Sequence, residues 1–351
     1  MSAEIARRGL RAPVNVTWEI TAECNLHCVH CLSDAGIPSH NELDTKECRE
    51  LIDQLATLKV FQVNIGGGEP FLRTDFLDLL SYSHKKGIVT CVSTNGMLIE
   101  NGLAKHLSTF EMLYLQVSLD GATAEVNDQI RGTGTHKKIL VAMDCLARHD
   151  VSFSINTVLT RTNYSQLDAL RDMAREYGAE LRVSRFRPSG RGKESKDYLG
   201  PDKEQLEAFA DWLNDHDLVR TGDSFFSLTS EGRRRKGLDM CGAAKMTCCV
   251  SPMGEVYPCA FLQERPFLAG NVREKSFKDL WDNSLVFAQF RNLKIETCMT
   301  CPRFEVCRGG CPAMAYHTYH DINMPDPECL INLRMDPPNK VHHVRSSLQS
   351  S

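Results

Sequence analysis

Two hydrophobic patterns alternate along the first 220 residues of the chain. Short β-branched or alternating runs, typical of strands, are separated by segments whose apolar residues recur every three or four positions, typical of helices. The predicted strands cover residues 14–20, 60–65, 88–93, 112–119, 151–159 and 181–187. The predicted helices cover residues 45–58, 75–86, 99–107, 136–149, 167–177 and 201–216. Such alternation predicts an α/β fold with a parallel sheet, either curled as a barrel or doubly wound.

Polar or glycine-rich loops follow the first four predicted strands. A cysteine-containing loop occupies residues 24–31, and the later loops occupy residues 66–70, 94–96 and 120–121. In parallel α/β folds, functional groups gather at the carboxyl ends of the strands. We therefore expect these loops to form one active-site face.

The first of these loops carries three thiols, at Cys24, Cys28 and Cys31. Three thiolates can hold three irons of a cubane iron–sulfur cluster, which leaves the fourth iron open for a substrate or cofactor. A structural zinc loop is the alternative, but zinc needs four ligands and usually takes them from paired Cys-x2-Cys clips. Since no fourth cysteine lies near this loop, the pattern favours the iron–sulfur site.

Several residues near the other strand ends suit ligand binding. Glu69 can accept a hydrogen bond from an ammonium group, although its glycine-rich loop can equally be a tight turn. Ser118 can bond a ribose or a carboxylate. Arg131 can bind a carboxylate through two hydrogen bonds, unless it is an ordinary surface arginine. Arg185 or Arg187 can hold a substrate carboxylate, unless their segment is only a polar loop.

The composition is that of an ordinary soluble protein. The chain has 351 residues, of which 42% are hydrophobic and 25% charged, enough for one large domain and a smaller one. Its net charge of −4 gives no general attraction to nucleic acid. The N-terminus lacks the apolar core of an export signal, and no apolar run is long enough to span a membrane. We therefore expect a cytoplasmic protein that binds neither nucleic acid nor a membrane.

The composition shifts near residue 220 towards cysteine, proline and glycine. We predict an N-terminal arm at residues 1–13, a core domain at 14–220, a cysteine-rich domain at 221–334 and a flexible tail at 335–351. Fifteen cysteines in a chain without an export signal indicate metal binding rather than disulfides. The cysteines outside the patterns are predicted to be buried thiols: Cys48, Cys91, Cys145 and Cys249.

The cysteine-rich domain carries a long spacing pattern. Cys241 is followed by twelve residues, Gly254, four residues and Cys259, and then by Cys298-x2-Cys301-x5-Cys307-x3-Cys311 and finally Cys329. Zinc is a competitor here, because a Cys-x2-Cys clip suits it. The cysteine loop upstream makes iron–sulfur clusters the better interpretation.

The first cysteine loop and the motifs after the other strands resemble the radical S-adenosylmethionine (SAM) enzymes. This resemblance implies a partial (β/α)6 TIM barrel in which the open iron chelates SAM, and in which reduction releases a 5′-deoxyadenosyl radical. The glycine-rich motif would bind the methionine amino group, and His30 stands where the family usually has an aromatic residue near the adenine. The residues that would contact SAM are His30, Gly67, Gly68, Glu69, Asn95, Ser118 and Arg131.

The C-terminal pattern resembles the SPASM extension of radical SAM peptide maturases, which implies two auxiliary [4Fe–4S] clusters and three clusters in all. The first would take Cys241, Cys259 and Cys311, with Cys248 or Cys249 as the fourth ligand. Only one of these two can ligate, because neighbouring side chains of a strand point to opposite faces, and we favour Cys248. The second would take Cys298, Cys301, Cys307 and Cys329. Full ligation leaves no iron for substrate, so we expect these clusters to relay electrons or support the fold.

Further segments resemble the mycofactocin maturases: residues 63–70, 118–128, 187–192, 221–226, 267–272 and 325–329. This resemblance implies a short ribosomal precursor peptide ending in Val-Tyr as the substrate. The enzyme would oxidatively decarboxylate the C-terminal tyrosine and then join valine to the tyrosine-derived unit by a carbon–carbon bond. It also implies a small leader-binding chaperone as a partner, and an electron donor such as flavodoxin or ferredoxin.

Other functions would fit the same cysteine patterns. A maturase of another peptide and a haem-precursor decarboxylase are the alternatives within this fold. Sulfatase maturases carry an aspartate directly after the cysteine equivalent to Cys259, where this chain has Ala260. A non-catalytic iron–sulfur or zinc scaffold, or an electron-transfer protein, is the alternative outside enzymes. The intact first loop together with the glycine-rich motif argues against it.

Overall fold

The computed structural model describes residues 10–216, 219–221 and 240–331. The predicted tail, residues 1–9 of the predicted arm and residues 222–226 lie outside these ranges. The strands are β1 (Asn15–Thr21), β2 (Gln62–Gly67), β3 (Val89–Thr94), β4 (Leu113–Ser118), β5 (Phe153–Leu159), β6 (Glu180–Arg185), β7 (Thr247–Val250), β8 (Glu255–Tyr257) and β9 (Gly270–Asn271). The helices of the first domain are α2 (Thr45–Thr57), α3 (Phe76–Lys85), α4 (Asn101–Leu107), α5 (Ala124–Arg131), α6 (Thr135–Arg148), α7 (Leu167–Glu176), α8 (Gly192–Leu199) and α9 (Lys203–Asp215). The later helices are α10 (Phe277–Asn283), α11 (Leu285–Arg291), α12 (Phe304–Cys307) and α13 (Pro312–Tyr319).

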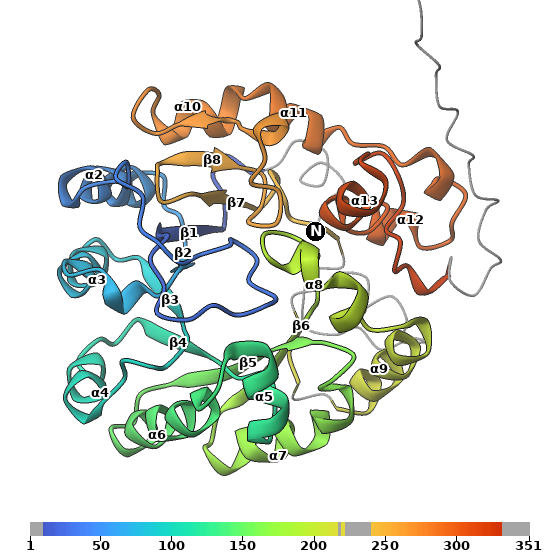
Figure 1. Cartoon of the computed structure of the whole chain (residues 1–351). Helices are drawn as coiled ribbons and strands as arrows, with labels where there is room; N and C mark the ends of the chain where they lie inside the picture. Colours follow the sequence, from blue (N-terminus) through green and yellow to red (C-terminus); the bar gives the residue numbers. More distant parts are fainter. Residues whose placement is uncertain (1–9, 217–218, 222–239, 332–351) are drawn as a thin grey trace, which may run out of the picture.

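One sheet of nine strands organises the described part of the chain, in the order β6-β5-β4-β3-β2-β1-β7-β8-β9. Strands β1 to β6 lie in chain order, and every neighbouring pair among them is parallel. Helices α2, α3, α4, α6 and α7 lie on the outer side of the curved strands (Figure 1). This confirms the predicted α/β fold with a parallel sheet.

The helices form where the sequence combines a cap with an apolar stripe, and α2 is an example. Asp44 accepts a hydrogen bond from the backbone N–H of Glu47 at 2.8 Å, and the Glu47 carboxylate accepts one from Asp44 N–H at 2.9 Å. This capping box satisfies two donors that a helix start otherwise leaves unpaired. The stripe that α2 buries against the sheet consists of Cys48, Leu51, Ile52 and Leu55. Burial of such side chains is the main source of helix stability in a small helix.

The C-terminal third contributes to the same sheet, which the sequence did not predict. Strand β7 pairs in parallel with β1, with Cys248 opposite Val16, and β8 and β9 continue the sheet in antiparallel pairs. The sheet therefore crosses the domain boundary predicted at residue 220, and that boundary stays a prediction. Helices α5 and α8, of eight residues each, were also not predicted. Among the described residues, no helix combines the length and apolarity needed to cross a membrane.

Candidate active site

A cavity of about 270 Å³ lies inside the curved sheet towards the carboxyl ends of its strands, and we call it the strand-end cavity. Each of the first six strands contributes a polar side chain to its wall: Thr17, Asn64, Ser93, Ser118, Asn156 and Ser184. Nine of the ten residues predicted for the first cluster and SAM also line it: Cys24, Cys28, His30, Cys31, Gly67, Gly68, Asn95, Ser118 and Arg131. Three of the four loops predicted to share one face therefore meet around one cavity, whereas residues 120 and 121 lie outside its wall.

The three thiols of the first loop are unbridged and face this cavity. The loop is held by a hydrogen bond from Cys24 N–H to the carbonyl of Gly36 at 3.0 Å. Burial raises the pKa of Cys28 to about 11, and the nearby Arg131 opposes this rise. Within the described ranges, no three His, Cys, Asp or Glu side chains converge closely enough to hold a single metal ion. Three thiolates are the donor set of a cubane cluster with one open iron, whereas a structural zinc ion takes four ligands.

Glycines 67 and 68 allow the loop after β2 to pack against the cysteine loop. A Cβ atom on Gly68 would lie 1.8 Å from the carbonyl oxygen of Glu23, and Gly67 has a φ of +107°. The backbone N–H of Gly68 donates to the carbonyl of Thr21 at 2.8 Å. A side chain at either position would push the two loops apart. The glycines thus set the position of the cysteine loop, in addition to lining the cavity.

Glu69 is the one predicted residue of this group that does not line the cavity. Its buried carboxylate accepts hydrogen bonds from Thr94 Oγ1 at 2.9 Å and from Asn95 N–H at 2.8 Å. Burial raises the pKa of Glu69 to about 7, and these hydrogen bonds oppose the rise. In this structure Glu69 therefore joins the loops after β2 and β3. It also fixes Asn95, whose side-chain amide donates to Asn25 Oδ1 at 2.7 Å.

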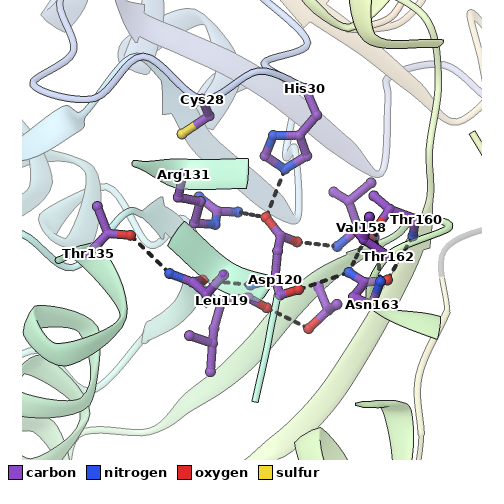
Figure 2. A network of polar contacts seen from close by, with 12 residues as sticks. Cys28, His30, Leu119, Asp120, Arg131, Thr135, Val158, Thr160, Thr162 and Asn163 are labelled. Carbon is purple, nitrogen blue, oxygen red and sulfur yellow. Dashed lines mark hydrogen bonds and ion pairs between the residues drawn. The ribbon is translucent and has the colours of Figure 1, made fainter. Parts of the chain in front are cut away.

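Asp120, directly after β4, organises two of the predicted SAM contacts (Figure 2). Its Oδ2 atom lies 2.8 Å from His30 Nε2 and 2.7 Å from an Arg131 guanidinium nitrogen, and Oδ1 accepts a hydrogen bond from Val158 N–H at 2.7 Å. Burial alone would raise the pKa of Asp120, but Arg131 and His30 lower it to about 2. From the sequence, residues 120–121 were predicted only as a turn. No local sequence pattern indicates that His30, from a loop, and Arg131, from a helix, meet at Asp120.

His30 and Arg131 keep polar atoms available for a ligand. Both side chains line the strand-end cavity. The buried atoms His30 Nδ1 and Arg131 Nε have no hydrogen-bond partner among the described residues. Buried polar atoms are normally paired, so these two point to a polar molecule that completes the site. The residues present therefore fit the SAM and iron–sulfur group that the sequence implied.

Arg185, one of the two arginines predicted to hold a substrate carboxylate, lines the strand-end cavity but is already paired with acidic side chains. Its guanidinium, at the end of β6, is buried and binds both carboxylate oxygens of Asp326 at 2.8 and 2.9 Å. It also lies 3.1 Å from a carboxylate oxygen of Glu328. Arg185 therefore joins the sheet to the C-terminal cysteine segment. The other candidate, Arg187, also lines the cavity, with its guanidinium 4.4 Å from the ring centre of Phe261, so the carboxylate-binding role of either arginine stays a prediction.

The thiols predicted for the first auxiliary cluster meet in part. Three of these thiols, from Cys241, Cys259 and Cys311, are neighbours. Burial raises the pKa of Cys259, and the nearby thiolates of Cys241 and Cys311 raise it further. Burial raises the pKa of Cys249 as well, with Glu19 and Cys259 among its charged neighbours. The charged neighbour of Cys248 is instead Arg291. In the β7–β1 pairing, Cys249 lies opposite Thr17, which lines the strand-end cavity, and Cys248 lies opposite Val16. This register supports Cys249 as the fourth ligand, and the preference for Cys248 stays a prediction.

The thiols predicted for the second auxiliary cluster share one small cavity, which is lined by Cys298, Cys301, Cys307 and Cys329. Burial raises the pKa of Cys307 to about 12, and its neighbours Cys329 and Cys298 add to the rise. Cys307 is the last residue of α12, and Cys329, from the segment after α13, lies in the same cavity. The donor set is therefore that of a site with four thiolates.

Comparison with known proteins agrees with this site. Residues 18–174 match the Radical SAM superfamily, and residues 241–311 match the iron–sulfur cluster-binding domain SPASM. Mycofactocin maturase MftC of Mycobacterium tuberculosis H37Rv is 44% identical over 329 residues, which cover 92% of this chain and 84% of that protein. AdoMet-dependent heme synthase of Methanosarcina barkeri is 32% identical over 343 residues, which cover 91% of this chain and 97% of that protein.

Solved structures show the same fold. Crystal structures of Streptococcus suis SuiB, bound to S-adenosylmethionine and to precursor peptide SuiA, align with a TM-score of 0.74 and 20% identity. They cover 92% of this chain, and the alignments span 78% and 77% of the SuiB chains. The two domain matches imply SAM and iron–sulfur clusters as cofactors. The chain therefore belongs to the mycofactocin maturase family of radical SAM proteins and carries a C-terminal SPASM domain.

Proposed function

We propose that this protein modifies a short ribosomal precursor peptide that ends in Val-Tyr. It decarboxylates the C-terminal tyrosine oxidatively and then joins the valine to the tyrosine-derived unit by a carbon–carbon bond. The observation that carries this proposal is the gathering of three unbridged thiols and the SAM-binding candidates around one cavity. The similarity to a protein named mycofactocin maturase supports a peptide as the substrate class.

The residues around the strand-end cavity have separate tasks in this proposal. Cys24, Cys28 and Cys31 hold the cluster that binds SAM, and together these cofactors supply a radical that abstracts hydrogen. Ser118 and Arg131 bind and orient SAM. The buried wall excludes water, which would otherwise quench reactive species.

The two C-terminal cysteine sets hold auxiliary clusters in this proposal. Cys241, Cys259 and Cys311 hold the first, with Cys248 or Cys249 as the fourth ligand. Cys298, Cys301, Cys307 and Cys329 hold the second. Clusters with four protein ligands suit electron relay, and an electron donor such as flavodoxin or ferredoxin reduces the protein from outside. A small chaperone presents the leader part of the peptide.

Replacing Asp120 with asparagine should weaken SAM binding and destabilise the protein. The change removes the buried negative charge that holds Arg131 and His30. An unpaired buried charge costs about 3–5 kcal/mol when a partner is lost, so we expect the free energy of unfolding to fall by up to this amount. Equilibrium binding of SAM and denaturant unfolding measure the two effects.

Asp128→Asn is the control for this prediction. Asp128 lies on the same helix as Arg131, but its carboxylate accepts a hydrogen bond from Gly134 N–H, so the change should leave SAM affinity unchanged. Equal SAM affinity in Asp120→Asn and the wild type would contradict the positioning role of Asp120.

The proposed function is tested by anaerobic turnover of the holoenzyme with SAM, a strong reductant, the chaperone and a precursor peptide ending in Val-Tyr. We expect 5′-deoxyadenosine and a peptide that mass spectrometry shows to be decarboxylated and then crosslinked. Purified under the same conditions, the protein should contain about twelve irons, as three cubanes require.

The other functions predict different results in the same experiment. SAM cleavage with an unchanged peptide would reject the proposed substrate while keeping the reaction class. A haem precursor offered in place of the peptide tests the decarboxylase alternative, which the 32% identity to a heme synthase makes worth including. Stoichiometric zinc without SAM cleavage would support a scaffold instead.

A further inference from the structure

A second cavity, of about 280 Å³, adjoins the strand-end cavity, and we call it the adjoining cavity. The two share wall residues from three parts of the chain: Glu19 of β1, Leu32, Ser33 and Ala35 after the cysteine loop, and Ala260 and Phe261 after β8. A molecule in the adjoining cavity would therefore lie next to the predicted SAM-binding residues.

Glu19 stands at the junction of the two cavities. Its side chain is almost fully buried, with 4% of its surface exposed, and accepts a hydrogen bond from Gln263. The side-chain amide of Gln263 also donates to the carbonyl of Ala260 at 3.1 Å, which fixes its orientation. A carboxylate offers about four acceptor positions, so one bond from Gln263 leaves room for a further donor.

The rest of the adjoining cavity is mixed in character. Leu32, Pro252, Met253 and Phe261 give it apolar walls, while Glu19 and Gln263 place polar groups at the junction. Such a combination suits a flat ring that carries one hydroxyl group, because the ring buries apolar surface and the hydroxyl finds a hydrogen-bond partner. The cationic group of the wall, Lys193, lies 2.8 Å from Glu264 and is paired.

We propose that the adjoining cavity binds the tyrosine ring of the peptide, and that Glu19 accepts a hydrogen bond from its phenolic hydroxyl. This inference rests on the proposed function and names the residue that selects the substrate. Ala260 and Phe261 close the other side of the junction, next to Cys259. The ring is thus held between the loop of the SAM-binding cluster and a ligand of the first auxiliary cluster.

The test compares two peptides that differ only in the last residue, one ending in Val-Tyr and the other in Val-Phe. The dissociation constant of each is measured by fluorescence anisotropy with unreduced, SAM-bound holoenzyme and the chaperone, so that no turnover interferes. A hydrogen bond to the Glu19 carboxyl group favours the tyrosine peptide on the order of tenfold in the wild type. Glu19→Met keeps the length of the side chain but removes the acceptor, and it should bring the ratio close to one.

Two further variants separate recognition from general damage. Glu19→Gln retains an acceptor oxygen and should keep part of the preference for tyrosine. Glu255→Gln changes another acid of the same cavity, whose carboxylate accepts a hydrogen bond from the Tyr257 hydroxyl at 2.9 Å, and it should keep the full preference. Iron content and SAM cleavage without peptide confirm that each variant is intact.

The outcomes distinguish this inference from the proposed function. An unchanged tyrosine preference in an intact Glu19→Met enzyme would overturn the role of Glu19, although the peptide would still be the substrate. A wild-type enzyme that modifies the tyrosine peptide but binds both peptides equally would also overturn it. A wild-type enzyme that neither binds nor modifies either peptide would overturn both the inference and the proposed function.

Discussion

An enzyme in which Cys24 is replaced by alanine is expected to form no 5′-deoxyadenosine when it is reduced in the presence of SAM. The strand-end cavity offers three thiols, from Cys24, Cys28 and Cys31. Two thiols cannot hold a cubane that keeps one iron open for SAM. Chromatography of the reaction mixture measures 5′-deoxyadenosine, and iron analysis should show a loss of about four of about twelve irons.

Cys48→Ala is the matched control for this prediction. Cys48 belongs to the buried stripe of α2, and its thiol donates a hydrogen bond to the carbonyl of Leu43 at 3.6 Å. It lies outside both cavities. Removing it should cost some stability but leave iron content and SAM cleavage close to the wild type. Wild-type deoxyadenosine formation in Cys24→Ala would show that the first loop does not hold the cluster that binds SAM.

The sequence predicted the features that local patterns determine. The six strands and most of the outer helices follow from hydrophobic periodicity, because each short segment carries its own signal. The meeting of three of the four predicted loops follows from the rule that parallel strands end at one side of the sheet. Residues such as Ser118 and Asn95, which directly follow or end a strand, could therefore be placed at the cavity from the sequence alone.

The sequence did not predict the features that depend on distant partners. Asp120 gains its role from His30, which precedes it by 90 residues, and Arg185 gains its role from Asp326. Glu19 looked like an ordinary polar position of a strand until Gln263 and the second cavity were in place. No local pattern carries such information, because the pairing is set only when the C-terminal third packs against the sheet.

The ion pair between Arg185 and Asp326 supports the second prediction, which concerns stability and the auxiliary clusters together. Both side chains are about 1% exposed, and the carboxylate binds the guanidinium through two hydrogen bonds. Asp326→Ala leaves the guanidinium buried without this partner. We expect the free energy of unfolding to fall by about 3–5 kcal/mol in denaturant titrations. Glu50→Ala, which removes an exposed pair with Lys46, should change it little.

Asp326 also holds the backbone beside two predicted cluster ligands. Its carboxylate accepts hydrogen bonds from Cys311 N–H at 2.9 Å and from Glu328 N–H at 3.0 Å. Glu328 directly precedes Cys329. Asp326→Ala should therefore lower the iron bound at both auxiliary sites, while the cluster of the first loop and SAM cleavage are retained.

A double variant separates the stability effect from the positioning of these ligands. In Arg185→Met with Asp326→Leu, both members of the pair lose their charge, while Glu328, which lies 3.1 Å from Arg185 and is 18% exposed, keeps its own. Apolar replacements of a buried ion pair are often neutral or stabilising. We expect stability to recover in large part, whereas auxiliary iron should stay low because Cys311 N–H has still lost its acceptor. If the stability and the auxiliary iron content recover together, Arg185 and Asp326 contribute only to packing and do not position the cluster ligands. If neither falls in Asp326→Ala, the C-terminal cysteine segment is held in place by other contacts.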